Sequence, residues 1–265
     1  MSLLKTDRMI ADKEGAIGWI TFNNPARHNA VSMEMWEALF DIVSDYGRDE
    51  AIRVIVLKGA GDKAFVSGAD ISEFDEKRSS AETTRTYNET SYKATLALTA
   101  VNKPTIAMVR GYCIGGGVST ALSCDLRIAS EGAKFGVPAA RLGLGYEYDG
   151  VRKLMDVVGP SFTKEIFFTA RQFTAQEALA MGLVNRVLPD AQLEAFVRDY
   201  AATIAANAPL TVASIKTIVG EALKDEAVRD RALCDLVVDQ CFASADYVEG
   251  RQAFMEKRKP QFNGR

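Results

Sequence analysis

The sequence has 265 residues, of which 48% are hydrophobic and 25% are charged, values typical of a soluble globular protein. Its 32 Lys and Arg residues against 35 Asp and Glu residues give a net charge of -3, so no positive field favours binding to a nucleic acid. No apolar run approaches the roughly 20 residues that cross a bilayer, and residues 1–10 lack a signal-peptide core. We therefore expect a cytoplasmic protein with no nucleic-acid or membrane partner.

The cysteine and histidine content argues against a metal site. Cys113, Cys124, Cys234 and Cys241 form no CxxC pair and lie in apolar stretches, so we expect buried, reduced thiols. His28 is the only histidine, which excludes a histidine-based zinc site and leaves one ring for any Ser-His-Asp triad.

The first part of the chain alternates between strand and helix patterns. Residues 15–23 and 51–59 are apolar and β-branched, which predicts strands. Between them Ser32 is a helix N-cap, followed by apolar residues at helical spacing as far as Gly47. The alternation continues with a helix over 87–100, a strand over 104–110, a helix from Gly115 and a strand over 124–130. This order predicts an α/β fold.

Beyond Pro160 the pattern becomes helical. A short strand is predicted over 183–188, and helices are predicted over 161–169, 174–181, 191–206, 210–223, 228–242 and 245–257. The sequence therefore predicts an α/β core over residues 1–189 and a C-terminal helical region over residues 190–265.

Two glycine-containing turns are candidates for a ligand site. Gly115, Gly116 and Gly117 follow a strand and precede a helix, a place where backbone amides can face a ligand or merely form a tight turn. A second turn, FVSGADI at 65–71, also follows a strand. Neither GxGxxG nor GxxxxGK[ST] occurs, so nucleotide-binding loops lose their support. Two such turns facing one pocket would give the paired N–H donors that a thioester carbonyl needs as it becomes an enolate.

Several separated motifs resemble the crotonase superfamily, also called the enoyl-CoA hydratase/isomerase family. They are NNPARHNAVS at 23–32, KAFVSGADI at 63–71, KPTIAMVRGYCIGGGVSTALSCDLRIAS at 103–130, KFGVPAARLGLG at 134–145, FTARQFTAQEALAMGLVNRVLP at 168–189, SADYVEG at 244–250 and AFMEKRKPQF at 253–262. The resemblance covers nearly the whole chain. It implies a ββα superhelical core, a C-terminal helical region used for trimerisation, and a homotrimer or a dimer of trimers.

The resemblance also implies an acyl-CoA substrate and no cofactor beyond the coenzyme A moiety of that substrate. By matching positions, Ala69 and Gly116 would supply the oxyanion-hole amides, the second aided by the positive end of its helix. The coenzyme A moiety would lie along Arg27, Ala69, Asp70 and Ile71, with Phe254 and Lys257 recruited from the C-terminal helix.

The hydratase pattern fails at two positions. A hydratase-type member carries one glutamate two residues after the triple glycine and a second in a PE pair, whereas this chain has Ser119 and Ala139 there. An alanine cannot transfer a proton, so the usual pair of acid and base is missing. We interpret Ser119 as filling the vacated space.

The segment LGLGYEYDG at 142–150 holds the remaining candidates. Glu147 falls where dienoyl-CoA isomerases carry a catalytic aspartate, and Tyr146 falls where the methylmalonyl-CoA decarboxylase branch carries a pocket tyrosine. That branch usually has a histidine at the position of Ala69. We interpret Asp149 as a helix cap.

These residues predict an acyl-CoA enzyme that stabilises an enolate, with the source of the enolate left open. If a desolvating pocket makes Glu147 a base or an acid, the reaction is isomerisation. If the substrate carries its own carboxylate, loss of CO₂ forms the enolate, and Tyr146 orients the leaving group or returns the proton. An enoyl-CoA hydratase that uses Glu147, and a non-catalytic acyl-CoA-binding scaffold, remain the alternatives.

Overall fold

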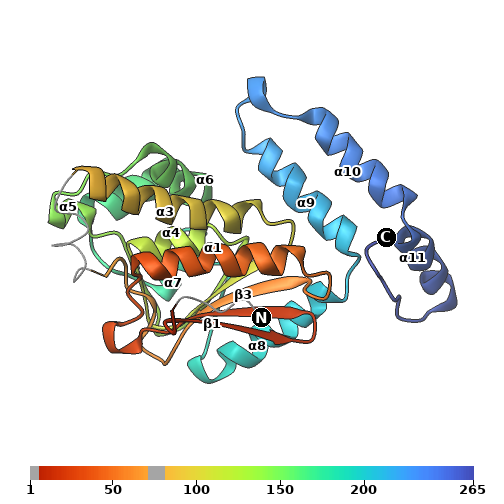
Figure 1. Cartoon of the computed structure of the whole chain (residues 1–265), viewed down its shortest axis with the longest axis horizontal. Coiled ribbons are helices and arrows are strands. Elements are labelled where there is room, and N and C mark those ends of the chain that lie inside the picture. Colours follow the sequence, from red (N-terminus) through yellow and green to blue (C-terminus); the bar gives the residue numbers. More distant parts are fainter. Residues whose placement is uncertain (1–5, 71–80) are drawn as a thin grey trace.

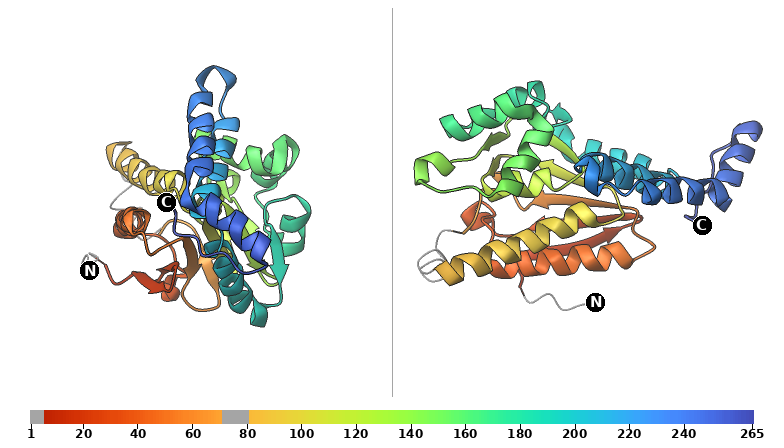
Figure 2. Two further views of the ribbon diagram at one scale, coloured as in Figure 1. Left: turned by 90° about the vertical axis from the view of Figure 1, so that its right-hand side faces the viewer. Right: turned by 90° about the horizontal axis from the view of Figure 1, so that it is seen from above.

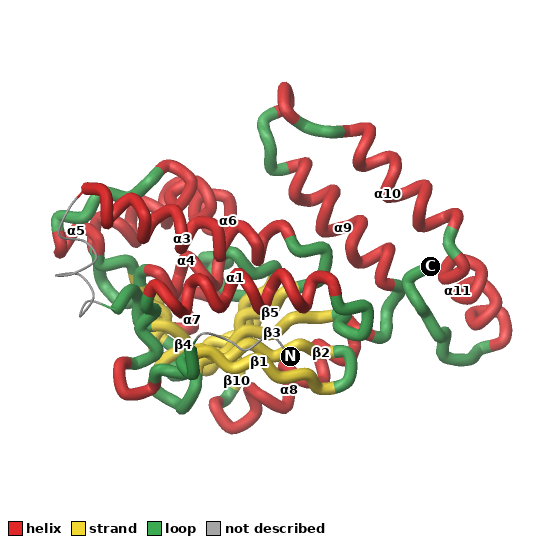
Figure 3. The backbone as a smooth tube through the Cα atoms, in the orientation of Figure 1, coloured by secondary structure: helices red, strands yellow, loops and turns green. Residues whose placement is uncertain are grey.

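The computed structural model describes residues 6–70 and 81–265 and contains two β-sheets flanked by helices (Figures 1 and 3). The larger sheet has the strand order β1-β2-β3-β5-β7-β10. Its strands are β1 (Met9–Glu14), β2 (Ile17–Phe22), β3 (Val54–Gly59), β5 (Thr105–Val109), β7 (Leu126–Ser130) and β10 (Arg186–Leu188). Apart from the antiparallel β1–β2 pair, neighbouring strands are parallel.

The smaller sheet has the order β4-β6-β8-β9 and is made of short strands. They are β4 (Ala64–Val66), β6 (Tyr112–Ile114), β8 (Lys134–Gly136) and β9 (Phe173–Thr174). The first three are parallel to one another, and β9 is antiparallel to β8. Because β4, β6 and β8 run in the same direction, the segments that follow them lie at one edge of this sheet.

The chain repeats a ββα unit. A long strand leads to a short one three times, from β3 to β4, from β5 to β6 and from β7 to β8. The helices that follow are α3 (Ala81–Ala100), α4 (Gly116–Leu122), and the pair α5 (Ala139–Leu142) and α6 (Tyr148–Thr169). The predicted α/β class and the ββα core are thus confirmed.

Helix α1 (Met33–Arg48) begins after Ser32, as the sequence predicts, and its apolar stripe covers one face of the larger sheet. Helix α8 (Asp190–Ala205) covers the opposite face. Alternating residues of β3 separate the two cores, since Ile55 and Leu57 pack in the cluster with α1, whereas Val54 and Val56 pack in the cluster with α8. The sheet is buried on both faces, which explains its nearly continuous apolar strands.

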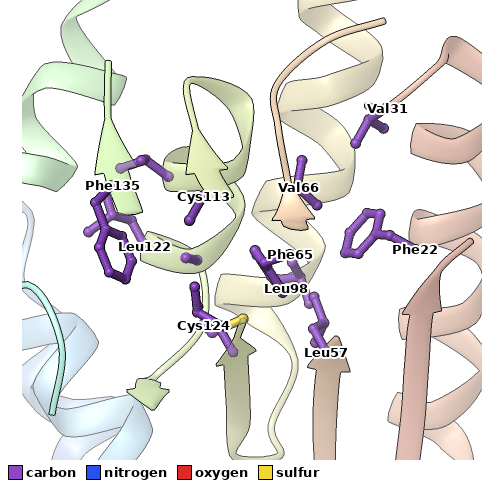
Figure 4. Close-up of a cluster of buried hydrophobic side chains, with 14 of the residues drawn as sticks. Phe22, Val31, Leu57, Phe65, Val66, Leu98, Cys113, Leu122, Cys124 and Phe135 are labelled. Carbon is purple, nitrogen blue, oxygen red and sulfur yellow. The ribbon is translucent and has the colours of Figure 1, made fainter. Parts of the chain in front are cut away.

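The short strands meet in the same core as α1. Figure 4 shows Val66 from β4, Cys113 from β6 and Phe135 from β8 among side chains of α3, α4 and the larger sheet. Phe65 also lies here, with its ring 5.8 Å from that of Phe22 in an edge-to-face arrangement. This packing fixes the ends of the short strands.

Helix α7 (Ala175–Ala180) precedes β10. Of the helices that follow β10, α8 packs on the larger sheet. Helices α9 (Pro209–Ala222), α10 (Arg231–Ala243) and α11 (Ala245–Glu256) project away from the core (Figures 1 and 2). The region from residue 190 onward is helical as predicted, and its projecting part begins with α9.

The end of the chain folds back along the projecting helices. The buried carboxylate of Asp246 accepts hydrogen bonds from the backbone nitrogens of Asn263 and Gly264, both at 2.8 Å. The guanidinium group of Arg53, at the start of β3, donates to the carbonyl oxygens of Ala205 and Phe262. These bonds tie the tail and α11 to the core.

The prediction of buried thiols is confirmed for two of the four cysteines. Cys113 and Cys124 are buried and unpaired, and burial raises the pKa of the Cys124 thiol to about 12. Cys234 and Cys241 are partly exposed, so the expectation that all four are buried is wrong. Both lie on α10, which has no fully buried residue.

In the described part of the chain no single helix is long and apolar enough to cross a membrane, and only α8 and α9 together reach that length and composition, across a bend of 101°.

Candidate active site

The loop between β2 and α1 is organised by one buried asparagine. Asn29 is fully buried with a φ of 55°, and its side-chain oxygen accepts a hydrogen bond from the backbone nitrogen of Asn24 at 3.0 Å. Its side-chain nitrogen donates to the carbonyl oxygens of Ala60 and Ala64, at 3.0 and 2.7 Å. Because Ala60 and Ala64 flank the turn from β3 to β4, Asn29 holds the β2–α1 loop against β4.

The same loop orients the amide of Ala69. Val31 forms an isolated parallel bridge with Ala69, in which the Val31 nitrogen donates to the Gly68 oxygen at 2.9 Å and the Asp70 nitrogen donates to the Val31 oxygen at 3.0 Å. In an extended segment successive amides point to opposite sides. Since Gly68 and Asp70 bond to Val31, the N–H of Ala69 points away from it.

The three consecutive glycines are needed for three different reasons. Gly115 has φ 54° and ψ −111°, a conformation open to glycine. A Cβ on Gly117 would lie 2.1 Å from the carbonyl oxygen of Val66, so close packing of α4 on β4 excludes a side chain there. A Cβ on Gly116 would meet nothing nearer than 3.8 Å. Packing therefore explains Gly117, whereas the open space at Gly116 is what a ligand needs.

Ala69 and Gly116 face the same space. They follow β4 and β6, which are neighbours in the smaller sheet, and the Ala69 nitrogen is 3.8 Å from the place where a Gly116 Cβ would lie. Gly116 is the first residue of α4 and has no acceptor within its helix. Neither amide has a backbone acceptor among residues 6–70 and 81–265. The structure thus brings the two candidate oxyanion donors together, and neither N–H is bonded to a described backbone oxygen.

The positions of the missing glutamates adjoin this space. Ser119 is half-buried and lies one turn beyond Gly116 on α4. Ala139 is buried and follows β8, the next strand after β6. The three parallel short strands thus lead to Ala69, Gly116 and Ala139 in turn. Neither Ser119 nor Ala139 brings a carboxylate to the site.

Tyr146 lies two residues before α6 and is partly buried. Its ring packs edge-to-face on Phe167 with centroids 4.8 Å apart, and a Cβ on Gly150 would lie only 3.1 Å from the ring. Burial raises the pKa of Tyr146, which keeps the hydroxyl protonated. Within the described residues this hydroxyl has no hydrogen-bond partner, so it can donate to a ligand.

Glu147 lies next to Tyr146 but is exposed. It occupies the N-cap position of α6, with no hydrogen bond from its side chain to the helix, and its carboxylate accepts a bond from the side-chain nitrogen of Asn88 at 3.0 Å. The desolvating pocket that would suit Glu147 for proton transfer is not formed by the described residues.

Asp149 lies inside the first turn of α6, so the expectation that it caps the helix is wrong. A carboxylate in the first turn still interacts favourably with the helix dipole.

Asn88 is a contact that the sequence did not reveal. It lies on α3, 59 residues before Glu147, and the bond between them joins α3 to the start of α6. The only signal was a polar helix surface, a pattern that solvent-facing helices share.

The coenzyme A candidates form two separate groups. Arg27 pairs with Asp70 at 3.2 Å, and the Asp70 carboxylate is buried while half of the Arg27 side chain is exposed. This pair lies beside Ala69, as the matched positions imply. Ile71 lies outside the described residues.

Phe254 and Lys257 belong to the second group. Phe254 is 85% exposed on α11, and Lys257 is the exposed residue that ends this helix. Helix α11 lies at the far end of the projecting region, away from the ββα core (Figures 1 and 2). The structure does not bring these two residues to Arg27 and Ala69 of the same chain.

The described residues contain no group of three or more His, Cys, Asp and Glu side chains that could hold a metal ion.

The family of the chain follows from comparison with known proteins. A family model described as enoyl-CoA hydratase/isomerase matches residues 12–265. The chain belongs to this family.

Relatives within the family carry different activities in their names. A short-chain-enoyl-CoA hydratase of Clostridium acetobutylicum is 33% identical over 256 residues, covering 97% of each chain. A methylmalonyl-CoA decarboxylase of Escherichia coli is 36% identical over 252 residues, covering 92% of this chain and 94% of its own. The crystal structure of an enoyl-CoA hydratase/carnithine racemase from Magnetospirillum magneticum superposes with a TM-score of 0.92 at 37% identity, covering 98% of this chain and 97% of that one.

Family membership assigns the coarse chemistry. The chain is an acyl-CoA enzyme with the crotonase fold. The hydratase and decarboxylase names among its relatives mean that overall similarity leaves the reaction type to the side chains of the site.

Proposed function

We propose that this protein decarboxylates an acyl-CoA whose α-carbon carries a carboxylate, as in a malonyl-type thioester. The observation that carries the proposal is the composition of the site. Two amides, from Ala69 and Gly116, face one space, while the adjoining positions hold Ser119 and Ala139 instead of carboxylates. Such a site stabilises an enolate, and residues 6–70 and 81–265 place no carboxylate at the two positions where a hydratase carries its acid and base. A substrate that generates its own enolate by losing CO₂ fits this composition.

The reaction needs no external oxidant, reductant or metal. The thioester oxygen accepts hydrogen bonds from the Ala69 and Gly116 amides, which lowers the energy of negative charge on that oxygen. The bond between the α-carbon and the carboxylate breaks, CO₂ leaves, and the electron pair of that bond forms the enolate. The α-carbon of the enolate then takes up a proton, which releases the shortened acyl-CoA.

Tyr146 is the residue that we assign to the returning proton. Its ring is held by Phe167, its hydroxyl has no partner among the described residues, and burial raises its pKa. A hydroxyl that stays protonated can donate to the enolate carbon and regain its proton from solvent. No further cofactor enters the proposal.

The test uses methylmalonyl-CoA, the substrate named for one relative. The full-length protein is incubated with this thioester in D₂O, and CO₂ release and deuterium in the propionyl-CoA product are followed together. We expect equal amounts of CO₂ and singly deuterated propionyl-CoA, at about 1 per second or faster. Unchanged methylmalonyl-CoA and malonyl-CoA after prolonged incubation would refute the proposed substrate class.

A second candidate is hydration or isomerisation of an enoyl-CoA by Glu147. It is favoured by the bond from Asn88, which orients a carboxylate near the start of α6, and by the hydratase names of several relatives. This candidate predicts that the wild-type protein hydrates crotonyl-CoA or shifts its double bond and that Glu147→Gln removes the activity. A binding scaffold, the third alternative, predicts that acyl-CoAs bind without any turnover.

We also propose that the functional unit is a homotrimer or a dimer of trimers. The helices that project from the core (Figure 1) support this, because α10 has no fully buried residue and many apolar side chains on these helices are exposed. The exposed apolar side chains there include Ile215, Val219, Leu223, Leu236, Phe242, Val248, Phe254 and Met255. In such an assembly Phe254 and Lys257 would reach the coenzyme A moiety bound by a neighbouring copy.

Sedimentation tests the assembly independently of catalysis. Phe242→Asp places a charge on the exposed apolar surface of α10, and we expect it to reduce the mass in solution to that of one chain. Ile10→Asp, on the partly exposed edge strand β1, is the matched control and should keep the wild-type mass. A wild-type protein that sediments as one chain would contradict the trimer.

A further inference from the structure

Ser119 lies on the open face of α4. Of the seven residues of this helix, Gly116 and Ser119 are half-buried and the other five are buried. Residues three apart share a helix face, and helical side chains lean toward the N-terminus of their helix. The Ser119 side chain is therefore directed toward Gly116, into the space that the Gly116 and Ala69 amides face.

The hydroxyl of Ser119 forms no hydrogen bond to another described residue, unlike the other hydroxyls in and next to α4. Thr120 and Ser123 each donate a hydroxyl hydrogen bond to the carbonyl oxygen four residues earlier, those of Gly116 and Ser119, both at 2.9 Å. Ser119 could bond in the same way to Gly115, but its hydroxyl has no partner in the part of the chain that the structure describes. A hydroxyl in mid-helix that does not bond to its own backbone is free to bond to water or a ligand.

No carboxylate in the described part of the chain is bonded to this hydroxyl. Ala139 presents only a buried methyl group, and the carboxylate of Glu147 is exposed and bonded to Asn88. A carboxylate at position 119 would repel an anionic substrate group brought beside it. A serine hydroxyl instead donates a hydrogen bond to such a group, and bonds to charged groups are the stronger kind.

We propose that Ser119 determines specificity by donating its hydroxyl hydrogen bond to the carboxylate on the α-carbon of the substrate. This proposal rests on the proposed function and deepens it, because it names the side chain that selects acidic acyl-CoAs. While Ala69 and Gly116 hold the thioester oxygen, Ser119, one helical turn away, meets the group attached to the neighbouring α-carbon. Serine at this position is then a recognition residue and not a filler of vacated space.

The test compares the equilibrium binding of two ligands that the enzyme cannot decarboxylate. One is the CoA thioester of 2-sulfopropionate, whose sulfonate replaces the carboxylate and cannot leave as CO₂. The other is propionyl-CoA, which lacks an acidic group. We expect the wild-type protein to prefer the sulfonate ligand by about 10-fold or more, and Ser119→Ala to lose that preference without weakening propionyl-CoA.

Two further variants separate recognition from structural change. Ser119→Thr keeps a hydroxyl and should keep the preference to within about threefold. Thr120→Val removes the adjacent hydroxyl, which bonds inside the helix, and should leave the preference unchanged. A preference that survives in Ser119→Ala, or equal wild-type affinity for the two ligands, would overturn the role of Ser119.

This binding test is separate from the test of decarboxylation. A wild-type protein that releases no CO₂ from methylmalonyl-CoA but shows a Ser119-dependent preference would refute the reaction and support the recognition of acidic ligands. A protein that releases CO₂, with a preference unaffected by Ser119→Ala, would support the reaction and refute the residue.

Discussion

The site has a backbone half and a side-chain half, and the two obey different constraints. The amides of Ala69 and Gly116 are placed by the smaller sheet, the bridge to Val31 and the packing of α4 on β4. The side chains at 119, 139, 146 and 147 lie on or next to the helices that follow β6 and β8. In our proposal, the fold places the two amides that hold a thioester oxygen, and these side chains determine what happens at the α-carbon.

The two halves also tolerate change differently. At Gly117 even a methyl group would collide with the Val66 carbonyl oxygen. Asn29 uses both its side-chain oxygen and its side-chain nitrogen to hold the loop beside β4. By contrast, Ser119 is only partly buried and Glu147 is exposed, so both can be exchanged with less disturbance of the core. A common scaffold can therefore support hydratases and decarboxylases, as the names of the relatives indicate.

The largest effect on turnover is expected from Gly116→Ala. The added methyl group fits the protein, with no atom nearer than 3.8 Å, but it fills the space between the two amides. Turnover should fall by about 10² to 10³-fold, the range for loss of an oxyanion donor, while the Tm stays at or above that of the wild type. Steady-state kinetics and thermal unfolding check both parts. Full activity would mean that the thioester oxygen binds elsewhere.

Gly117→Ala should show the opposite balance. Its methyl group would lie 2.1 Å from the Val66 carbonyl oxygen, so α4 must move away from β4. We expect a loss of about 1–3 kcal/mol in the free energy of unfolding, measured by urea denaturation, together with reduced turnover. If Gly117→Ala were as stable as Gly116→Ala, the distinction between a packing glycine and a ligand glycine would be wrong.

Tyr146→Phe tests the side-chain half. It keeps the ring against Phe167 and removes the proton donor, so we expect kcat for decarboxylation to fall by about 10- to 100-fold with little change in stability. Because burial raises the pKa of Tyr146 above its usual 10.0, the hydroxyl keeps its proton to higher pH, and the wild-type kcat should not fall through loss of this proton below pH 10.0. If Tyr146→Phe had the kcat of the wild type, water and not Tyr146 would return the proton to the enolate.

The smallest effect is expected from Asn88→Ala. Its only described contact with the site is the bond to the exposed Glu147, and the decarboxylation proposal gives Glu147 no step. Decarboxylation should change by less than about twofold, since solvent replaces a hydrogen bond at an exposed carboxylate. A loss of 10-fold or more would show that the orientation of Glu147 matters and would favour the second candidate function.

Much of the fold follows from local patterns in the sequence. The long buried strands can be predicted from their continuous apolar, β-branched runs, and helix α1 from apolar residues at helical spacing. The short strands β4, β6 and β8 have three residues each, too few to show a period. The strand β1 was missed because five of its six residues are exposed.

The candidate site was predicted less evenly. The oxyanion pair could be proposed because motifs identify Ala69 and Gly116 by position. The exposure of Glu147 and its bond to Asn88 depend on how α3 packs beside α6, and no local pattern records that contact. The separation of Phe254 and Lys257 from the core depends in the same way on the direction of the projecting helices.

The most direct test of the central claim, that this site makes an enolate without a carboxylate base, is crotonyl-CoA hydration by the wild-type protein and Glu147→Gln. Hydration is followed as loss of the absorbance of the conjugated thioester, with methylmalonyl-CoA decarboxylation measured on the same preparations. We predict no hydration by either protein and CO₂ release by both at similar rates. Hydration by the wild type at about 1 per second or faster, abolished in Glu147→Gln, would contradict the account and make Glu147 the catalytic carboxylate.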